Sequence, residues 1–167
     1  MKKIITFNEF MNEAWEDIDF SVKRKAAGVA IIWEGQILLV HPTGASWQKS
    51  SFGIPKGGIN DGEDVLEAAI RELREETGIV LNSTELDPEP LVANSYKPNG
   101  SLDRQLIYFT KAIRSLEEIG LASTTVPEHQ LQLEEIDWAG FVPIDRAYPK
   151  MHRSQLIILD RARYIKI

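Results

Sequence analysis

Three glutamates, Glu72, Glu75 and Glu76, lie close together in a segment with a helical pattern. Apolar residues of segment 63–77 recur at intervals of three and four, which predicts a helix with one buried stripe. At about 100° per residue, the three carboxylates fall within an arc of roughly 100° on another face. Carboxylates this close repel one another unless water or divalent cations lie among them, and Mg²⁺ prefers such hard oxygen ligands. The segment therefore predicts either a solvated acidic face or a metal site.

The loop before this helix favours the metal site. It contains Gly57, Gly58 and Gly62, which let the backbone approach a metal ion or a phosphate closely, and Pro55 stiffens the approach to them. The whole loop, residues 41–62, is long for a compact domain, and loops of that length are usually functional.

The loop and helix together carry a family resemblance. Segment Gly57–Ile79, GGINDGEDVLEAAIRELREETGI, matches the pattern GX5EX7REUXEEXGU at every defined position, where U is a bulky aliphatic residue. This pattern is the Nudix box, and the chain resembles Nudix hydrolases from about residue 26 to its C-terminus. Segments 38–42 (LLVHP), 54–57 (IPKG) and 135–161 also resemble a poorly characterised Nudix subgroup.

The resemblance implies a metal centre that holds one to three Mg²⁺ or Mn²⁺ ions. Arg71 would orient the box glutamates and Glu63 would support that arrangement. The ions would neutralise a diphosphate and align a bound water for in-line attack on phosphorus. The implied ligands are oxygen atoms of the box region: the carboxylates of Glu72, Glu75 and Glu76 and the backbone carbonyl of Lys56.

The general base has more than one candidate. In some relatives it is a glutamate of the box, which here is Glu72. In others it comes from a loop well after the box, where Glu135 stands with Glu134 as its neighbour. The alternative for this acidic pair is a solvated loop, so the sequence leaves the base open.

The sequence also contains weaker candidates for residues that contact the substrate. The ammonium of Lys56 is a candidate for a phosphate contact, and Arg104, after a predicted hairpin, is another. The aromatic rings of Trp47, Phe52 and Tyr96 are candidates for stacking on a base, although aromatic residues more often pack in or around a core. The three histidines, His41, His129 and His152, show no metal-ligand spacing and are expected to be structural.

The remaining patterns predict the elements around the site. Strands are expected over residues 26–33, 36–40, 91–97, 102–113 and 138–142, with a short one at 51–54 and a closing helix over 154–166. Residues 1–22 are expected to be a helical N-terminal extension, and 23–167 the Nudix hydrolase domain. Strands and helices interleave without regular alternation, which predicts a mixed sheet between helices. The resemblance implies the same α/β class, with the Nudix fold of an α/β/α sandwich.

Composition restricts the compartments and the partners that are expected for the protein. The 167 residues include no cysteine and no apolar run long enough to span a membrane, which fits a cytoplasmic protein and excludes thiolate chemistry. The net charge is −6 and the basic residues are scattered, so nucleic acid is not the expected partner. A homodimer is compatible with the sequence.

The expected function is Mg²⁺-dependent hydrolysis of a pyrophosphate bond in a nucleoside diphosphate derivative. Dinucleoside polyphosphates such as diadenosine tetraphosphate are the leading substrates, and oxidised nucleoside triphosphates, ADP-ribose and capped or triphosphorylated RNA ends are alternatives. A catalytically silent Nudix domain used for binding is a rival of another class, although such domains usually lose box glutamates that this chain keeps. An isopentenyl diphosphate isomerase is disfavoured, because that chemistry in the resembling family needs a cysteine.

Overall fold

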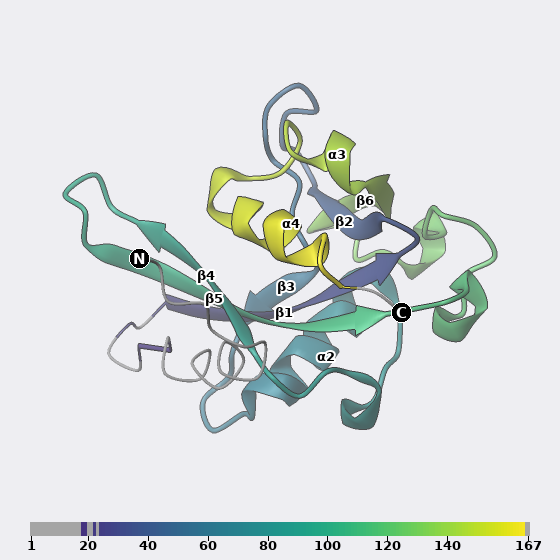
Figure 1. Ribbon diagram of the computed structural model, residues 1–167, viewed down its shortest axis with the longest axis horizontal. Coiled ribbons are helices and arrows are strands. Elements are labelled where there is room, and N and C mark those ends of the chain that lie inside the picture. The colour runs from purple at the N-terminus through teal and green to yellow at the C-terminus, as the bar shows by residue number, and fades with distance from the viewer. Residues whose placement is uncertain (1–17, 20–21, 23, 166–167) are drawn as a thin grey trace.

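The computed structural model describes residues 18, 19, 22 and 24–165 (Figure 1). The helix expected over residues 1–22 therefore lies almost entirely outside the described residues. Within that range, Ile18 is described and is buried in the core.

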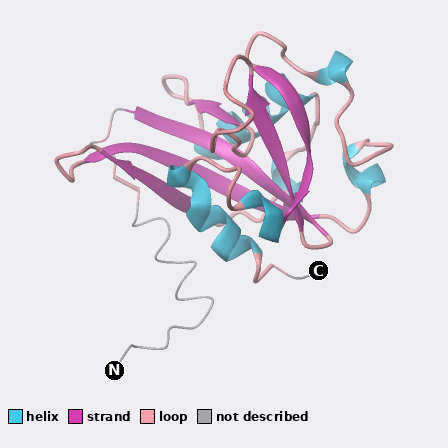
Figure 2. Cartoon of the chain, turned by 90° about the horizontal axis from the view of Figure 1, so that it is seen from above, coloured by secondary structure: helices cyan, strands magenta, loops and turns pink. Residues whose placement is uncertain are grey.

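The core of the protein is one mixed sheet whose strands follow the order β4-β5-β1-β2-β6, with β3 paired to β1. Strands β1 and β5 run parallel, and every other pair is antiparallel. The long β4–β5 hairpin, which turns at the predicted Pro98–Gly100 segment, extends beyond the rest of the sheet in both views (Figures 1 and 2). The strands are β1 (Arg24–Trp33), β2 (Gln36–Pro42), β3 (Lys56–Gly58), β4 (Leu91–Tyr96), β5 (Leu102–Ala112) and β6 (Ile136–Pro143).

One edge of β1 is divided between two strands. Its N-terminal part pairs with β3, where Gly28 faces Lys56, and its C-terminal end pairs with β2, where Ile32 faces Ile37. The short strand expected over residues 51–54 is reduced to isolated bridges at Phe52 and Gly53. The paired strand begins only at Lys56, because Pro55 has no N–H to donate and uses its carbonyl to accept from the Val29 amide.

Helices cover both faces of the sheet. Helix α2 (Val65–Thr77) lies on one face, and α3 (Ile144–Ala147) and α4 (Leu156–Ala162) lie on the other (Figure 1). Successive β1 residues supply the two cores in turn: Val29 and Ile31 pack toward α2, whereas Ala30 and Ile32 pack toward α4. The predicted α/β/α sandwich with a mixed sheet is confirmed.

Both ends of α2 have clear local causes. The side chain of Asp64 caps the N-terminus by accepting from the amide of Glu67, so the helix starts two residues later than expected. Gly78 ends it in the left-handed conformation, with φ of 71°.

The closing helix is shorter than the expected 154–166. A 3₁₀ turn over Arg153–Gln155 precedes α4, and the helix ends at Ala162. Its apolar spacing predicts Leu156, Leu159 and Ile165 on the inward face. In the structure Leu159 and Ile158 are buried, whereas Leu156 and Ile165 are only half-buried. None of the helices in the described part of the chain has the length and apolar character that crossing a bilayer requires.

Candidate functional site

The three box glutamates do not share one environment. Glu72 and Glu76 are buried, with 8% and 5% of their surface exposed, whereas Glu75 is exposed. A carboxylate oxygen of Glu76 accepts from the backbone N–H of Lys56 at 3.1 Å. Helix α2 therefore turns two carboxylates toward β3 and leaves the third at the solvent edge.

The backbone of Gly57 lies directly against the carboxylate of Glu72. A Cβ at position 57 would be 2.1 Å from Cδ of Glu72, which is closer than any van der Waals contact allows. The next glycine, Gly58, has open space around the same position. Only at Gly57 does the absence of a side chain allow β3 and α2 to come this close.

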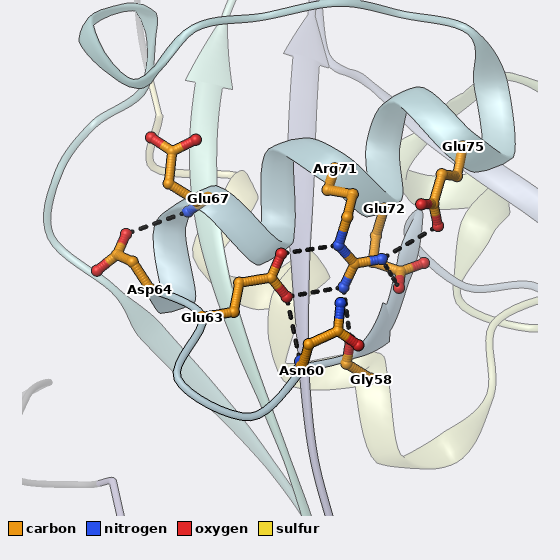
Figure 3. Close-up of polar contacts among 8 residues, drawn as sticks. All are labelled: Gly58, Asn60, Glu63, Asp64, Glu67, Arg71, Glu72 and Glu75. Atoms are coloured by element: carbon orange, nitrogen blue, oxygen red, sulfur yellow. Dashed lines mark hydrogen bonds and ion pairs between the residues drawn. The ribbon is translucent and has the colours of Figure 1, made fainter.

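Arg71 connects the loop to the helix, as Figure 3 shows. Its guanidinium makes two hydrogen bonds to Glu63, at 2.8 and 2.9 Å, and one to the carbonyl of Gly58 at 2.9 Å. Its third nitrogen contacts Glu72 at 2.8 Å and Glu75 at 3.1 Å. Glu63 also accepts from the Asn60 amide at 3.1 Å, so the loop, Glu63 and the helix form one connected polar network.

Burial and neighbouring charges shift the pKa values of the carboxyl groups in this network in opposite directions. Burial raises the pKa of Glu76 to about 8, while Lys56 counteracts the rise and Glu72 and Glu135 add to it. Burial also raises the pKa of Glu72, against the lowering effect of Arg71. The hydrogen bonds from Arg71 lower the pKa of Glu63 to about 2. The ionised forms of Glu72 and Glu76 are therefore destabilised by burial more than nearby positive charge stabilises them, whereas Arg71 stabilises the ionised form of Glu63.

The donor set fits a divalent ion in its chemistry. Glu72 and Glu76 offer buried carboxylate oxygens beside the Lys56 peptide, and a cation would offset the cost of ionising both carboxylates there. Mg²⁺ needs few protein ligands because it keeps several waters and takes substrate phosphates. Glu75 points to Arg71, and within the part of the chain that the structure describes no three His, Asp or Glu side chains converge as a ready metal cage.

A cleft of about 780 Å³ opens beside these glutamates. Lys56, Glu76 and Glu135 line it close to the box helix, and Arg104 lines it from β5. Glu134, the neighbour of Glu135, is exposed and is not among the residues that line the cleft. The cleft therefore brings together two of the four metal-ligand candidates, Lys56 and Glu76, with one of the two acidic loop residues and Arg104.

The three aromatic candidates lie elsewhere. Phe52 is buried in the core on the α4 face. Trp47 is 57% exposed and stacks on the buried His41 ring at 3.7 Å. Tyr96 is exposed on the β4–β5 hairpin. None of the three lines the cleft in the described structure, so no base-stacking role is visible for them there.

Other residues of the cleft had not been predicted to contact a substrate. Arg24 lines it, as do Ser95, His152, Ser154 and Gln155. The side chain of Gln155 is buried and accepts from the amide of Ile54 at 3.0 Å. No local pattern marked Arg24, which precedes the strand expected from residue 26. Its place in the cleft follows from the parallel pairing of β1 and β5, which sets it beside Arg104. His152 was expected to be structural, and its side chain accepts from the amide of Ser154 while it also lines the cleft.

The family model of the NUDIX domain matches residues 22–161, and the chain belongs to the NUDIX family. Among similar curated proteins, the RNA pyrophosphohydrolase of Dinoroseobacter shibae is 37% identical over 71 residues, covering 42% of this chain and 44% of that protein. The RNA pyrophosphohydrolase of Rhizobium meliloti is 47% identical over 49 residues, covering 29% of each. The chain thus matches less than half the length of these relatives.

Solved structures share the fold at lower identity. A MutT NUDIX hydrolase from Burkholderia pseudomallei superposes with a TM-score of 0.61 at 23% identity, covering 82% of this chain and 95% of that one. The Ap4A hydrolase of C. elegans, in a binary complex, gives a TM-score of 0.54 at 20% identity over 83% and 93% of the two chains. Likeness at this level shows the fold, and the reaction has to be argued from the site.

Proposed function

We propose that the protein hydrolyses a pyrophosphate bond in a nucleoside diphosphate derivative and depends on Mg²⁺, with Mn²⁺ as a substitute. The observation that carries this proposal is the buried pair Glu72 and Glu76 beside β3. Glu76 accepts from the Lys56 amide and lines the cleft, and Glu72 lies against the backbone of Gly57. Two close carboxylates at the side of a cleft suit a reaction in which a metal ion holds a diphosphate.

Each residue of the network has a separate task in this proposal. Glu72, Glu75 and Glu76, with the carbonyl of Lys56, would hold the metal, which neutralises phosphate charge and makes a bound water more acidic. Arg71 positions Glu72 through a direct hydrogen bond, and Glu63 fixes Arg71 by accepting two more. The Lys56 ammonium, on the cleft side, contacts a substrate phosphate.

Glu135 is the stronger of the two loop candidates for the general base. It lines the cleft, and its charge contributes to the raised pKa of both Glu72 and Glu76, so it lies near them. Glu135→Gln is expected to lower kcat about 100-fold without weakening Mg²⁺ binding, because a positioned base contributes roughly that factor. The matched control is Glu134→Gln, which is expected to keep its activity. Turnover near the wild-type level in Glu135→Gln would return the role to Glu72.

Two groups of substrates are proposed, one as the leading candidate and one as the second candidate. Dinucleoside polyphosphates remain the leading substrates, with ADP-ribose and oxidised nucleoside triphosphates as alternatives. RNA 5′ ends are the second candidate, and the specific support for them is the resemblance of the box region to proteins named RNA pyrophosphohydrolases. The acidic composition, with a net charge of −6, argues against long nucleic-acid contacts but not against a short 5′ end.

One panel tests the activity. The purified protein is incubated with Mg²⁺ and diadenosine polyphosphates, ADP-ribose, canonical and oxidised nucleoside triphosphates, and a triphosphorylated RNA oligonucleotide, and the products are separated by ion exchange. Glu75→Gln is the control, because its exposed side chain can change without disturbing the core. We expect one substrate group to be cleaved, with the activity lost on chelation and in the variant. A folded protein that binds Mg²⁺ and cleaves nothing would point to a silent binding domain.

A further inference from the structure

The α4 face of the sheet presents three rows of side chains beside the cleft. Strand registers define them, because residues paired across β4, β5, β1 and β3 share a face. The outer row is Ser95, Arg104 and Arg24; the middle row is Ala93, Leu106 and Ala26; the inner row is Leu91, Tyr108, Gly28 and Lys56. The middle row packs with the apolar core on the α4 face, which confirms the face on which all three rows lie.

Positively charged side chains belong to the inner and outer rows, and the apolar middle row forms a floor between them. Lys56 belongs to the inner end, since its Cβ lies where a side chain of Gly28 would be. Arg24 and Arg104 form the outer end. The middle row, which lies between the inner and the outer end, carries only small or aliphatic side chains. Arg24 precedes Gly28 by four residues, so the two ends are about 13 Å apart along β1.

Among the residues that the structure describes, the two arginines of the outer end share a single carboxylate, that of Asp103. A nitrogen of Arg24 lies 3.3 Å from Asp103, and a nitrogen of Arg104 lies 3.9 Å from the same carboxylate. Both arginine side chains are more than half exposed, so these ion pairs contribute little to stability and can exchange for a ligand. In a chain with a net charge of −6, two arginines aligned in register over a cleft form an uncommon positive site.

We propose that Arg24 and Arg104, with the hydroxyl of Ser95, bind a phosphate group attached to the 3′ side of the substrate's nucleoside. This inference rests on the proposed function, which places the scissile diphosphate at Lys56 and the box glutamates. The floor of Ala93, Leu106 and Ala26 suits an uncharged ribose and base, because a bare phosphate there would lose water without gaining a partner. Phosphates on the 5′ and 3′ sides of one ribose lie closer together than the backbone positions of these two ends, so the long side chains of Lys56, Arg24 and Arg104 reach over the floor to meet them.

The subsite discriminates between the substrate groups. A dinucleoside polyphosphate has all its phosphates in one chain between the nucleosides and offers nothing to the outer arginines. A nucleotide with a 3′-phosphate, or the 5′ end of an RNA with its first 3′-phosphodiester, supplies an anion at both ends. The outer arginines therefore favour this second kind of substrate within the proposed class.

Binding of small nucleotides tests the subsite without requiring turnover. The probes are 5′-AMP, adenosine 3′,5′-bisphosphate and the dinucleotide pApA, measured by calorimetry in the presence of Mg²⁺. We expect the wild-type protein to bind adenosine 3′,5′-bisphosphate at least about tenfold more tightly than 5′-AMP, since charge-assisted hydrogen bonds contribute that much. A preference shared by pApA extends the subsite to an RNA 5′ end, and a preference for the bisphosphate alone restricts it to a terminal monoester.

Substitutions then assign the preference to the arginines. The double variant Arg24→Gln and Arg104→Gln is expected to lose the preference, whereas Arg114→Gln, an exposed arginine away from the cleft, keeps it. Equal binding of all three nucleotides by the wild type, including no binding of any, overturns the proposal. So does a double variant that keeps the preference. Neither result depends on hydrolysis, so loss of the proposed activity and loss of this subsite are separate outcomes.

Discussion

Glu76→Gln is expected to lower kcat/KM by at least about 100-fold while leaving the metal-free protein as stable as the wild type or more stable. A neutral amide cannot supply the charge that a divalent ion needs, and losing a few kcal/mol of that stabilisation corresponds to such a factor. The amide oxygen still accepts from the Lys56 N–H, so the contact between α2 and β3 survives. Because the carboxylate is buried near Glu72 and Glu135, its removal also ends a repulsion, with a gain of about 1 kcal/mol.

Two measurements check this result. Rates are followed across a Mg²⁺ titration, and denaturant unfolding is compared with and without chelator. Glu67→Gln is the matched control, because Glu67 lies on the exposed part of the same helix and should change neither quantity. A Glu76→Gln protein with near wild-type turnover would remove Glu76 from the metal centre. A variant that unfolds readily would show that its carboxylate supports the fold instead.

Gly57→Ala is expected to cost about 1–3 kcal/mol of stability and at least about 100-fold in turnover. The new methyl group would overlap the carboxylate of Glu72, with 2.1 Å to its Cδ, and must push it away from β3. A displacement of that size at a proposed metal ligand is expected to misplace the reacting groups.

Gly58→Ala isolates the cause of that effect. Neither Gly57 nor Gly58 has a positive φ, so alanine is acceptable to the backbone at both positions. A methyl group at Gly58 meets nothing within 4 Å, and the Gly58 carbonyl that accepts from Arg71 is unchanged. We expect wild-type turnover and unfolding for Gly58→Ala. If both variants behaved alike, the close approach of Gly57 to Glu72 would not be the reason that a glycine is needed.

The box helix was the most predictable part of the molecule. Its apolar periodicity and its stop at Gly78 follow from local rules, and Arg71 and Glu75 form an ordinary i,i+4 pair. The contacts of Arg71 with Glu63 and Glu72 were implied by the Nudix resemblance and not by the helical spacing. The unequal burial of Glu75 and Glu76 was not predictable, because a helical projection places both on one arc. What separates them is the packing of β3 against α2, a contact that the projection does not contain.

The pair of arginines on the β1–β5 side of the cleft could not be predicted, for a different reason. Arg24 and Arg104 are 80 positions apart and become neighbours only because β1 and β5 pair in parallel, which no local pattern specifies. The aromatic residues show the reverse case. Phe52 was a candidate for base stacking on residue type alone, yet it is buried among Trp138 and the other residues of the core on the α4 face. Residue type indicated which chemistry was available, and the pairing of distant strands decided where it is available.

Strand β1 separates two regions that can change independently during evolution, because β3 pairs with one of its edges and β5 with the other. The strand segment that meets the box helix, Lys56–Gly58, is short and confined by Glu72 and Glu76, so few substitutions there preserve the reaction. The surface that would meet the rest of the substrate comes from β4, β5 and the 3₁₀ turn at Arg153–Gln155, on the opposite face of the sheet. Substitutions in these separated regions should combine almost additively. A duplicated gene of this kind can therefore change the surface of its β4–β5 hairpin by drift while its box helix stays intact.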